Sequence, residues 1–175
     1  MICQEDISGK GEIFLSGSLA AWFTDGGLSE RAAIGNFLAL NAETEEYGLA
    51  LTPEEAAELA ETRRLALEGS GRLELGGGAP EEIIRVFSRS EYLYPHNYAR
   101  TLNEITEAFY ALKNETLDAV SDRDLIEFLF DRFEREYRGD AAALLDGREL
   151  EKLVRSLKFG PEDEPDEEEG EEEDE

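Results

Sequence analysis

Four carboxylates in the second half of the chain have the spacing of a metal site. Glu104 and Glu107 form an E-x-x-E pair, and Asp124 and Glu127 form a D-x-x-E pair. Side chains three residues apart lie on one face of a helix. Carboxylate oxygens are the ligands that Mg²⁺ prefers, and a metal held by two such pairs can activate water. A metal-dependent hydrolase that uses these four residues is therefore one hypothesis.

The apolar spacing around the same residues favours a different interpretation. One seam at helical spacing is formed by Tyr98, Leu102, Ile105, Phe109 and Leu112. At about 100° per residue, Glu104 and Glu107 point away from this seam. Asp124 and Glu127 likewise lie opposite the apolar face of their own segment, which includes Phe133. We therefore expect the four carboxylates to lie on solvated faces, while Phe109 and Phe133 are buried.

The other reactive residues do not form a catalytic set. His96 is the only histidine and Cys3 the only cysteine, and they are far apart in the sequence. Nucleophilic catalysis needs a base beside the nucleophile. Glycines 76–78 precede a helix as in an anion-binding loop, but the Lys-Ser or Lys-Thr pair is missing. We predict no catalytic residue and no cofactor.

Tyrosines gather where a loop is expected to lead into a helix. Tyr92, Tyr94 and Tyr98 follow one another at this junction, with Phe87 just before them. Tyrosines can anchor a protein interface through an apolar ring with a polar tip. They can equally fill the junction between two helices of one bundle. The three tyrosines are our candidate partner-binding residues, and both interpretations remain open.

Charge and composition restrict the class of protein. The 175 residues include 43 acidic and 17 basic side chains, with a formal net charge of -26. Nucleic-acid binding through a basic patch is therefore excluded. No segment approaches the roughly 20 apolar residues of a membrane span, and the opening lacks the shape of a secretory signal. We expect a cytoplasmic protein whose partner is another protein.

The chain divides into three parts. Residues 161–175 contain 12 carboxylates and no apolar side chain except proline. Such a segment cannot bury enough apolar surface to fold, so a disordered acidic tail is predicted. Residues 1–27 form an N-terminal arm of uncertain structure. Residues 28–160 remain as the helical domain.

Helix start signals and apolar periodicity predict an all-α fold. Thr52 with Glu55 forms a capping box around Pro53, and Ser121 with Asp124 gives a second start. We expect a small bundle of about five or six helices. Residues 72–75 alternate leucine and charge, which indicates a short strand or an extended connector, so we expect at most one short strand pair. The expected helices cover approximately residues 28–46, 52–70, 80–87, 95–114 and 121–137, a turn at 141–145, and a final helix around 150–157.

About residues 47–145 resemble an uncharacterised family of small bacterial proteins. The resemblance lies in YGLALTPEEAAELAETR (47–63), GRLELGGG (71–78) and the stretch from NYARTL to DRF (97–133). It implies a compact, mainly helical bacterial domain that accompanies another uncharacterised protein. We therefore expect a non-enzymatic interaction or regulatory module. The alternatives are the metal-dependent hydrolase and an acidic inhibitor that mimics DNA.

Overall fold

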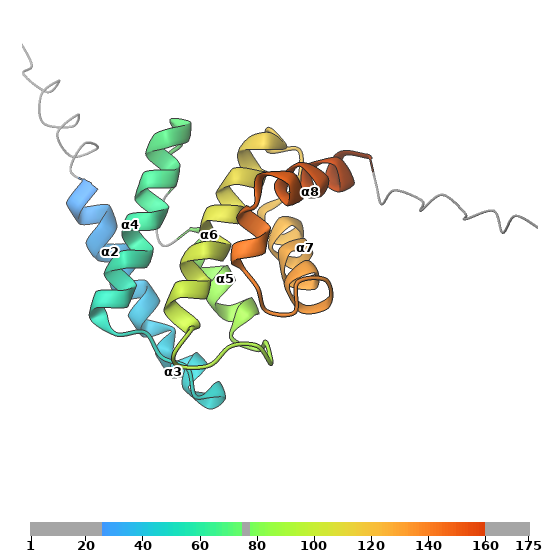
Figure 1. Cartoon of the computed structure of the whole chain (residues 1–175). Helices are drawn as coiled ribbons and strands as arrows, with labels where there is room; N and C mark the ends of the chain where they lie inside the picture. The colour runs from blue at the N-terminus through green and yellow to red at the C-terminus, as the bar shows by residue number, and fades with distance from the viewer. Residues whose placement is uncertain (1–25, 75–77, 160–175) are drawn as a thin grey trace, which may run out of the picture.

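The computed structural model describes residues 26–74 and 78–159, and in these ranges the fold is all-α (Figure 1). The predicted bundle is confirmed, and no strand occurs in the described residues. The tail at 161–175 and residues 1–25 of the predicted arm lie outside them. The elements are α2 (Gly26–Ala39), α3 (Asn41–Thr44), η1 (Glu45–Tyr47), α4 (Pro53–Ser70), α5 (Ala79–Phe87), α6 (Tyr98–Glu115), α7 (Asp122–Arg135), η2 (Ala142–Leu145) and α8 (Gly147–Phe159). None of these helices combines the length and apolarity that crossing a bilayer requires.

The first expected helix, at 28–46, is divided into α2, α3 and η1. The side chain of Asn41 donates to the carbonyl of Leu51 and accepts from its amide, both at 2.8 Å. Thr44 Oγ1 donates to the carbonyl of Leu49 at 2.8 Å. These bonds hold the returning chain against α3. Gly48, with φ 73°, ends η1 in the left-handed conformation that glycine adopts at low cost.

The two predicted helix starts are confirmed. Thr52 Oγ1 accepts from the amide of Glu55 at 3.2 Å, and Glu55 Oε2 accepts from the amide of Thr52 at 2.8 Å. These reciprocal bonds satisfy amides that have no partner within α4. At the start of α7, Ser121 Oγ accepts from the amide of Asp124 at 3.2 Å.

Helices α4 and α6 lie side by side and run in the same direction (Figure 1). Thr62 Oγ1 donates to Asn103 Oδ1 at 2.6 Å near the middle of the pair. Arg72 Nε, just beyond α4, donates to Asn114 Oδ1 at 2.7 Å near the end of α6. In a parallel pair the end of the first helix lies far from the start of the second, so the chain must return along the bundle. It does so through α5, which lies between α4 and α6 in the sequence. Helix α5 packs against α6 and α7.

Aromatic side chains fill the centre of the bundle. Phe109 and Phe133 are each 0% exposed, as predicted. The ring of Phe87 from α5 meets the rings of Phe130 and Phe133 edge-on, with centroids 5.3 and 5.4 Å apart. Edge-to-face packing of this kind adds to the stability gained by burial. These contacts fix α5 and α7 against each other.

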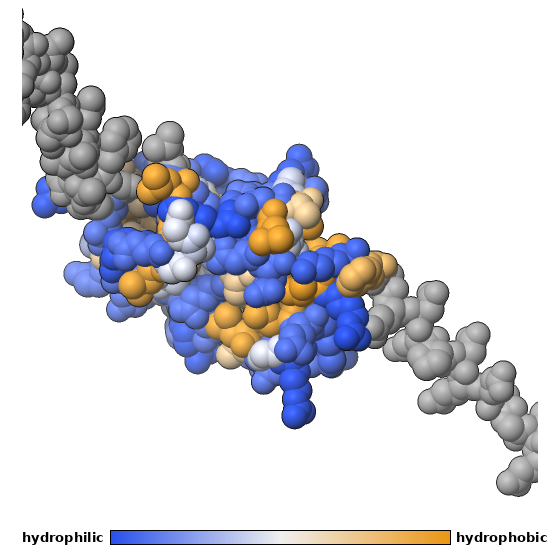
Figure 2. Space-filling view, turned by 90° about the horizontal axis from the view of Figure 1, so that it is seen from above, coloured by the Kyte–Doolittle hydropathy of each residue, from blue (hydrophilic) through white to orange (hydrophobic). Residues whose placement is uncertain are grey.

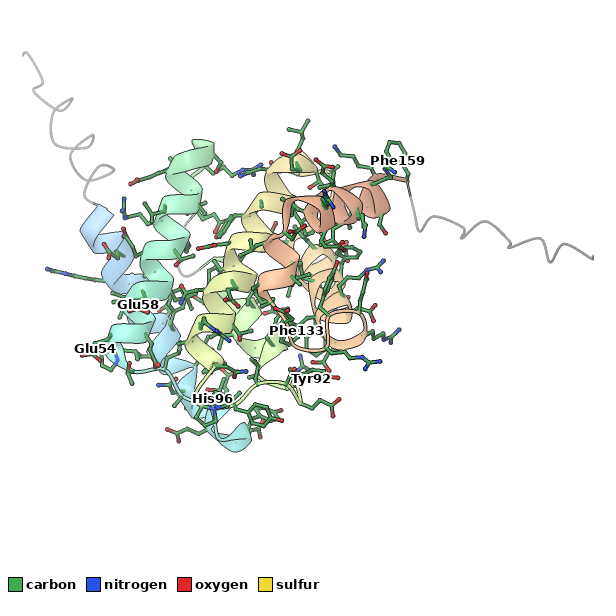
Figure 3. The ribbon with its side chains drawn as sticks, in the orientation of Figure 1. Glu54, Glu58, Tyr92, His96, Phe133 and Phe159 are labelled. Atoms are coloured by element: carbon green, nitrogen blue, oxygen red, sulfur yellow. The ribbon has the colours of Figure 1, made fainter. Side chains whose placement is uncertain are left out.

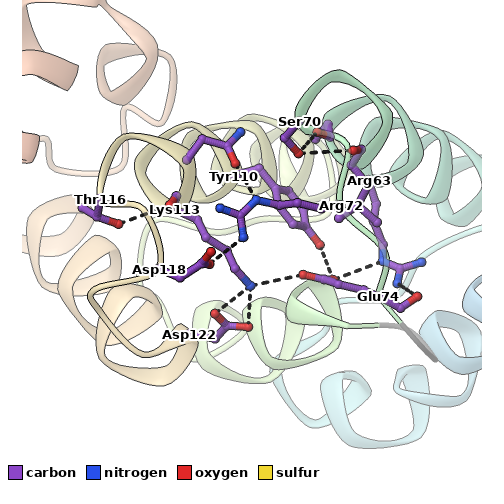
Figure 4. A network of polar contacts seen from close by, with 12 residues as sticks. Arg63, Ser70, Arg72, Glu74, Tyr110, Lys113, Thr116, Asp118 and Asp122 are labelled. Atoms are coloured by element: carbon purple, nitrogen blue, oxygen red, sulfur yellow. Dashed lines mark hydrogen bonds and ion pairs between the residues drawn. The ribbon is translucent and has the colours of Figure 1, made fainter.

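A polar network centred on Glu74 ties the segment after α4 to α6 and α7 (Figure 4). The hydroxyl of Tyr110 donates to Glu74 Oε2 at 2.7 Å, and Lys113 Nζ lies 3.3 Å from Glu74 Oε1. Arg63 Nε lies 3.6 Å from the same carboxylate, and Lys113 Nζ also pairs with Asp122 at 2.8 Å. The Glu74 side chain is only 15% exposed. Opposite charges therefore balance a mostly buried carboxylate.

Residues 72–74 form no strand pair, which agrees with the expectation of at most one such pair and with the alternative of a connector. Arg72 Nη1 pairs with Asp118 Oδ1 at 2.5 Å. Asp118 and Leu117 both have positive φ angles, 58° and 51°. Side-chain contacts of Arg72 and Glu74, and not a strand ladder, hold this segment against the rest of the bundle.

Candidate interaction groove

A groove runs along the surface between α4 and α6. Its first hollow has a volume of about 460 Å³ and is lined by Glu55, Glu58, Thr62, His96, Ala99, Arg100, Asn103, Glu104 and Glu107. A second hollow of about 350 Å³ is lined by Thr62, Leu65, Ala66, Glu107, Tyr110, Ala111 and Asn114. Thr62 and Glu107 line both hollows, so we treat them as one feature, the α4–α6 groove. Figure 3 shows Glu58 on α4 and His96 just before α6.

Helical spacing and small side chains create the groove. Glu55, Glu58 and Thr62 lie three and four residues apart, which places them on one side of α4. The hydrogen bond between Thr62 and Asn103 joins the two helices. Alanines at 66, 99 and 111 leave space that larger side chains would fill. The result is a trough with carboxylates on both walls and alanines along its length.

The α4–α6 groove carries a net negative charge. Burial raises the pKa of the Glu104 carboxyl, whereas Arg100, with Nε 3.8 Å away, lowers it. The Glu104 side chain is 22% exposed. Glu58 and Glu107 are exposed and form no ion pair with any described residue. The groove therefore presents negative charge that the described part of the chain does not neutralise.

The structure does not bring together the four carboxylates of the alternative metal hypothesis. Glu104 and Glu107 line the α4–α6 groove. Asp124 instead accepts from the hydroxyl of Ser121 at 2.6 Å, and Glu127 pairs with Arg123 at 3.0 Å. No group of three or more His, Cys, Asp or Glu side chains within residues 26–74 and 78–159 could hold a metal ion. Glu104 also departs from the expected solvated position, because it is mostly buried in the groove wall.

The three candidate tyrosines occupy different environments. Tyr98 is 1% exposed and belongs to the core. Tyr92 is half-buried and meets the ring of Phe133 edge-on, with centroids 6.3 Å apart. Tyr94 is 52% exposed and stacks on His96, with centroids 5.7 Å apart and an interplanar angle of 12°. Of the three, only Tyr94 is exposed to a partner, and it lies beside His96, which lines the groove.

Sequence reasoning missed Glu55 and Glu58 as groove residues. Their E-x-x-E spacing is visible, and it matches that of Glu104 and Glu107. The spacing fixes the face of each helix but not which helix lies beside it. The pairing of α4 with α6 is set by packing between residues about forty positions apart, such as Thr62 and Asn103.

Comparison with known proteins identifies one protein family whose model matches most of the chain. A family model matches residues 36–163, and its description is "Family of unknown function (DUF6323)". This match extends beyond residues 47–145, on which the resemblance to an uncharacterised family was based, and it confirms that resemblance. The searches found no match among curated proteins or among solved structures.

Proposed function

Because the chain belongs to this family of unknown function, we propose its role from its surface: it is a non-enzymatic module that binds a basic segment of a partner protein in the α4–α6 groove. The proposed setting is a complex in the bacterial cytoplasm. Negative charge along the groove attracts a segment rich in lysine and arginine and selects against acidic ones. Alanines between the carboxylates leave room for the apolar stems of those side chains.

The observation that carries the proposal is that two acids of the groove, Glu58 and Glu107, have no cationic partner among the described residues, whereas Glu104 in the same groove pairs with Arg100. Three carboxylates on or just beyond α7 have arginine partners four residues away: Glu127 with Arg123, Asp131 with Arg135, and Glu136 with Arg132. Glu58 and Glu107 have no such partner among the described residues, although they face a shared hollow. Acids that repel one another across a groove gain more from an incoming cation than acids already paired.

Each end of the groove adds a contact of a different kind. Tyr94 and His96 provide a stacked aromatic pair near one end. Leu65, 55% exposed, lines the second hollow near the other end. A partner helix with basic residues on one side and apolar residues beside them would use all three. Helix-in-groove recognition relies on this combination of apolar anchors and charge.

Capture from cells of the source organism tests the proposal. The full chain serves as bait beside a Glu58→Lys/Glu107→Lys variant, and recovered proteins are compared by mass spectrometry. The matched control is Glu127→Lys/Asp131→Lys, which makes the same change in net charge on exposed positions of α7. The proposal expects a partner that is lost with the groove variant and retained with the control. A synthetic peptide with that partner's basic segment should then compete for binding.

The same experiment separates the proposal from its alternatives. A partner retained equally by both variants would contradict binding in the groove. A DNA-binding protein that both charge-reversed variants lose would favour the acidic mimic of DNA, because that mechanism depends on total surface charge. Saturable stabilisation of the full chain by Mg²⁺ or Mn²⁺, abolished by Glu107→Gln, would favour the hydrolase.

A further inference from the structure

We propose that α8 pairs with α8 of a second copy of this chain, antiparallel and across a two-fold axis. This inference does not depend on the α4–α6 groove. It begins from a separate hollow of about 580 Å³ between α8 and the end of α6, which we call the α8 groove. Besides Gly147, the α8 residues that line it are Leu150, Glu151, Val154, Arg155, Lys158 and Phe159.

Apolar side chains along the α8 groove are incompletely covered. Leu150 and Val154 are only partly buried against the core, and Phe159 is 82% exposed. In Figure 3, Phe159 lies at the far end of α8, away from the bundle. Figure 2 shows apolar surface continuing from the place where the C-terminal trace leaves the body. Contiguous apolar surface of this kind marks interaction sites.

The lining residues form two neighbouring ridges of one helix. Residues 150, 154 and 158 make one i, i+4 row, and residues 151, 155 and 159 make the next. Together they follow α8 for most of its length, which is about 20 Å for 13 residues. Rows of this kind pack against the grooves of a second helix. The surface therefore has the shape of a helix docking site.

The order of charges selects a second copy in the antiparallel orientation. Glu151 lies in the first half of α8 and Lys158 near its end, and neither forms an ion pair with a described residue. Antiparallel pairing centred between Val154 and Arg155 brings Glu151 opposite Lys158 of the second copy, Leu150 opposite Phe159, and Val154 opposite Arg155. Two-fold symmetry forms each of these contacts twice. The same surface is therefore complementary to itself.

Parallel pairing would oppose like charges instead. Glu151 would then face its own copy, and so would Lys158. The 12 carboxylates of residues 161–175 follow directly after α8, so a parallel pair would also start both acidic segments at the same point. Antiparallel pairing starts them at opposite ends of the helix pair. At 0.15 M salt the Debye length is about 8 Å. The two acidic segments would start farther apart than this, at opposite ends of the helix pair, so the salt would screen most of the repulsion between them.

Sedimentation velocity on the full chain tests the proposal. Two 13-residue helices make a small interface, so association should be weak and visible between about 1 µM and 1 mM. The average mass should rise from that of one chain towards that of two. Glu151→Lys and Lys158→Glu should each shift this rise to at least tenfold higher concentration. The double variant Glu151→Lys/Lys158→Glu restores opposite charges at both contacts and should restore association.

Controls keep the outcome interpretable. Lys152→Glu makes the same charge change as Lys158→Glu on α8 but lies outside the groove lining, so it should leave association unchanged. Circular dichroism establishes that each variant is folded. A chain that stays monomeric throughout this range would overturn the proposal. Association that the double charge swap fails to restore would overturn the antiparallel pairing, as would cross-linking of Val154→Cys and its copy without cross-linking of Leu150→Cys to Phe159→Cys.

Discussion

The hydroxyl of Tyr110 donates a 2.7 Å hydrogen bond to Oε2 of Glu74 and so joins the middle of α6 to the chain that leaves α4. Burial, together with the nearby Glu74 carboxylate, raises the pKa of this phenol. Lys113 approaches the other oxygen of Glu74 at 3.3 Å. A mostly buried carboxylate is thus held by a hydroxyl on one side and a cation on the other.

Removing the Tyr110 hydroxyl should destabilise the fold. Tyr110→Phe keeps the ring but leaves Oε2 of Glu74 without this donor, which costs about 1–3 kcal/mol for a buried polar group. Urea unfolding measures the change. Tyr94→Phe is the control, because its ring is exposed and its effect should stay within about 0.5 kcal/mol. Equal stability of Tyr110→Phe and the unmodified chain would contradict this assignment.

Stability should fall as the pH rises above about 10, the ordinary pKa of tyrosine. Burial raises the pKa of Tyr98 to about 12, and that of Tyr110 is raised as well. The folded chain therefore keeps phenolic protons that the unfolded chain releases, so the stabilisation is complete below pH 10 and is lost towards pH 12. Urea unfolding across this range measures the slope. Tyr98→Phe should reduce the slope; an unchanged slope in Tyr98→Phe would count against the assignment.

Glycine at position 117 should stabilise the protein. Leu117 has φ 51°, which is a left-handed backbone conformation, and its side chain is 83% exposed. The side chain therefore makes little packing contact that could offset the cost of this conformation. The left-handed conformation costs a residue with a Cβ about 1–2 kcal/mol of folding free energy. Glycine avoids this cost, but its greater conformational freedom in the unfolded chain costs about 0.5–1 kcal/mol on folding. We expect Leu117→Gly to gain about 0.5–1 kcal/mol in thermal unfolding. Leu117→Ala keeps the strain and serves as the control; a gain of equal size in both variants would refute this explanation.

Truncating the central rings should cost far more than removing groove acids. Phe109→Ala and Phe133→Ala should each lose about 3–5 kcal/mol, because both rings are 0% exposed. Glu107→Ala, on the exposed groove wall, should stay within about 0.5 kcal/mol. Chemical denaturation of the three variants gives the comparison. The opposite ranking would mean that α6 is rotated about its axis.

Local signals made much of the fold predictable. The start of α4 depends on Thr52 and Glu55, which are three residues apart, and the buried face of α6 repeats within the helix itself. The break after α2 depends on Asn41 reaching Leu51. No periodicity reveals a bond of that kind, since it depends on how the chain returns.

The candidate site was less predictable than the fold. Glu104 and Glu107 were identified as a pair on one helix face, but their neighbours in the groove are Glu55 and Glu58 and not the acids of α7. Helix spacing gives the direction of a side chain relative to its own axis only. Which helix lies opposite is decided by tertiary packing across the bundle.

The parallel arrangement of α4 and α6 has a consequence for synthesis of the protein on the ribosome. Thr62 and Asn103 are 41 residues apart, and α4 with α6 is the most extensive helix pair in the described residues. At about 5–20 residues per second, α4 emerges roughly 2–8 s before the residues that cover it. Closing a loop of that length also costs about 3 kcal/mol of chain entropy. Through this interval the apolar face of α4 has only α2 to cover it, so co-translational folding of the domain is completed late, after α6 has left the exit tunnel.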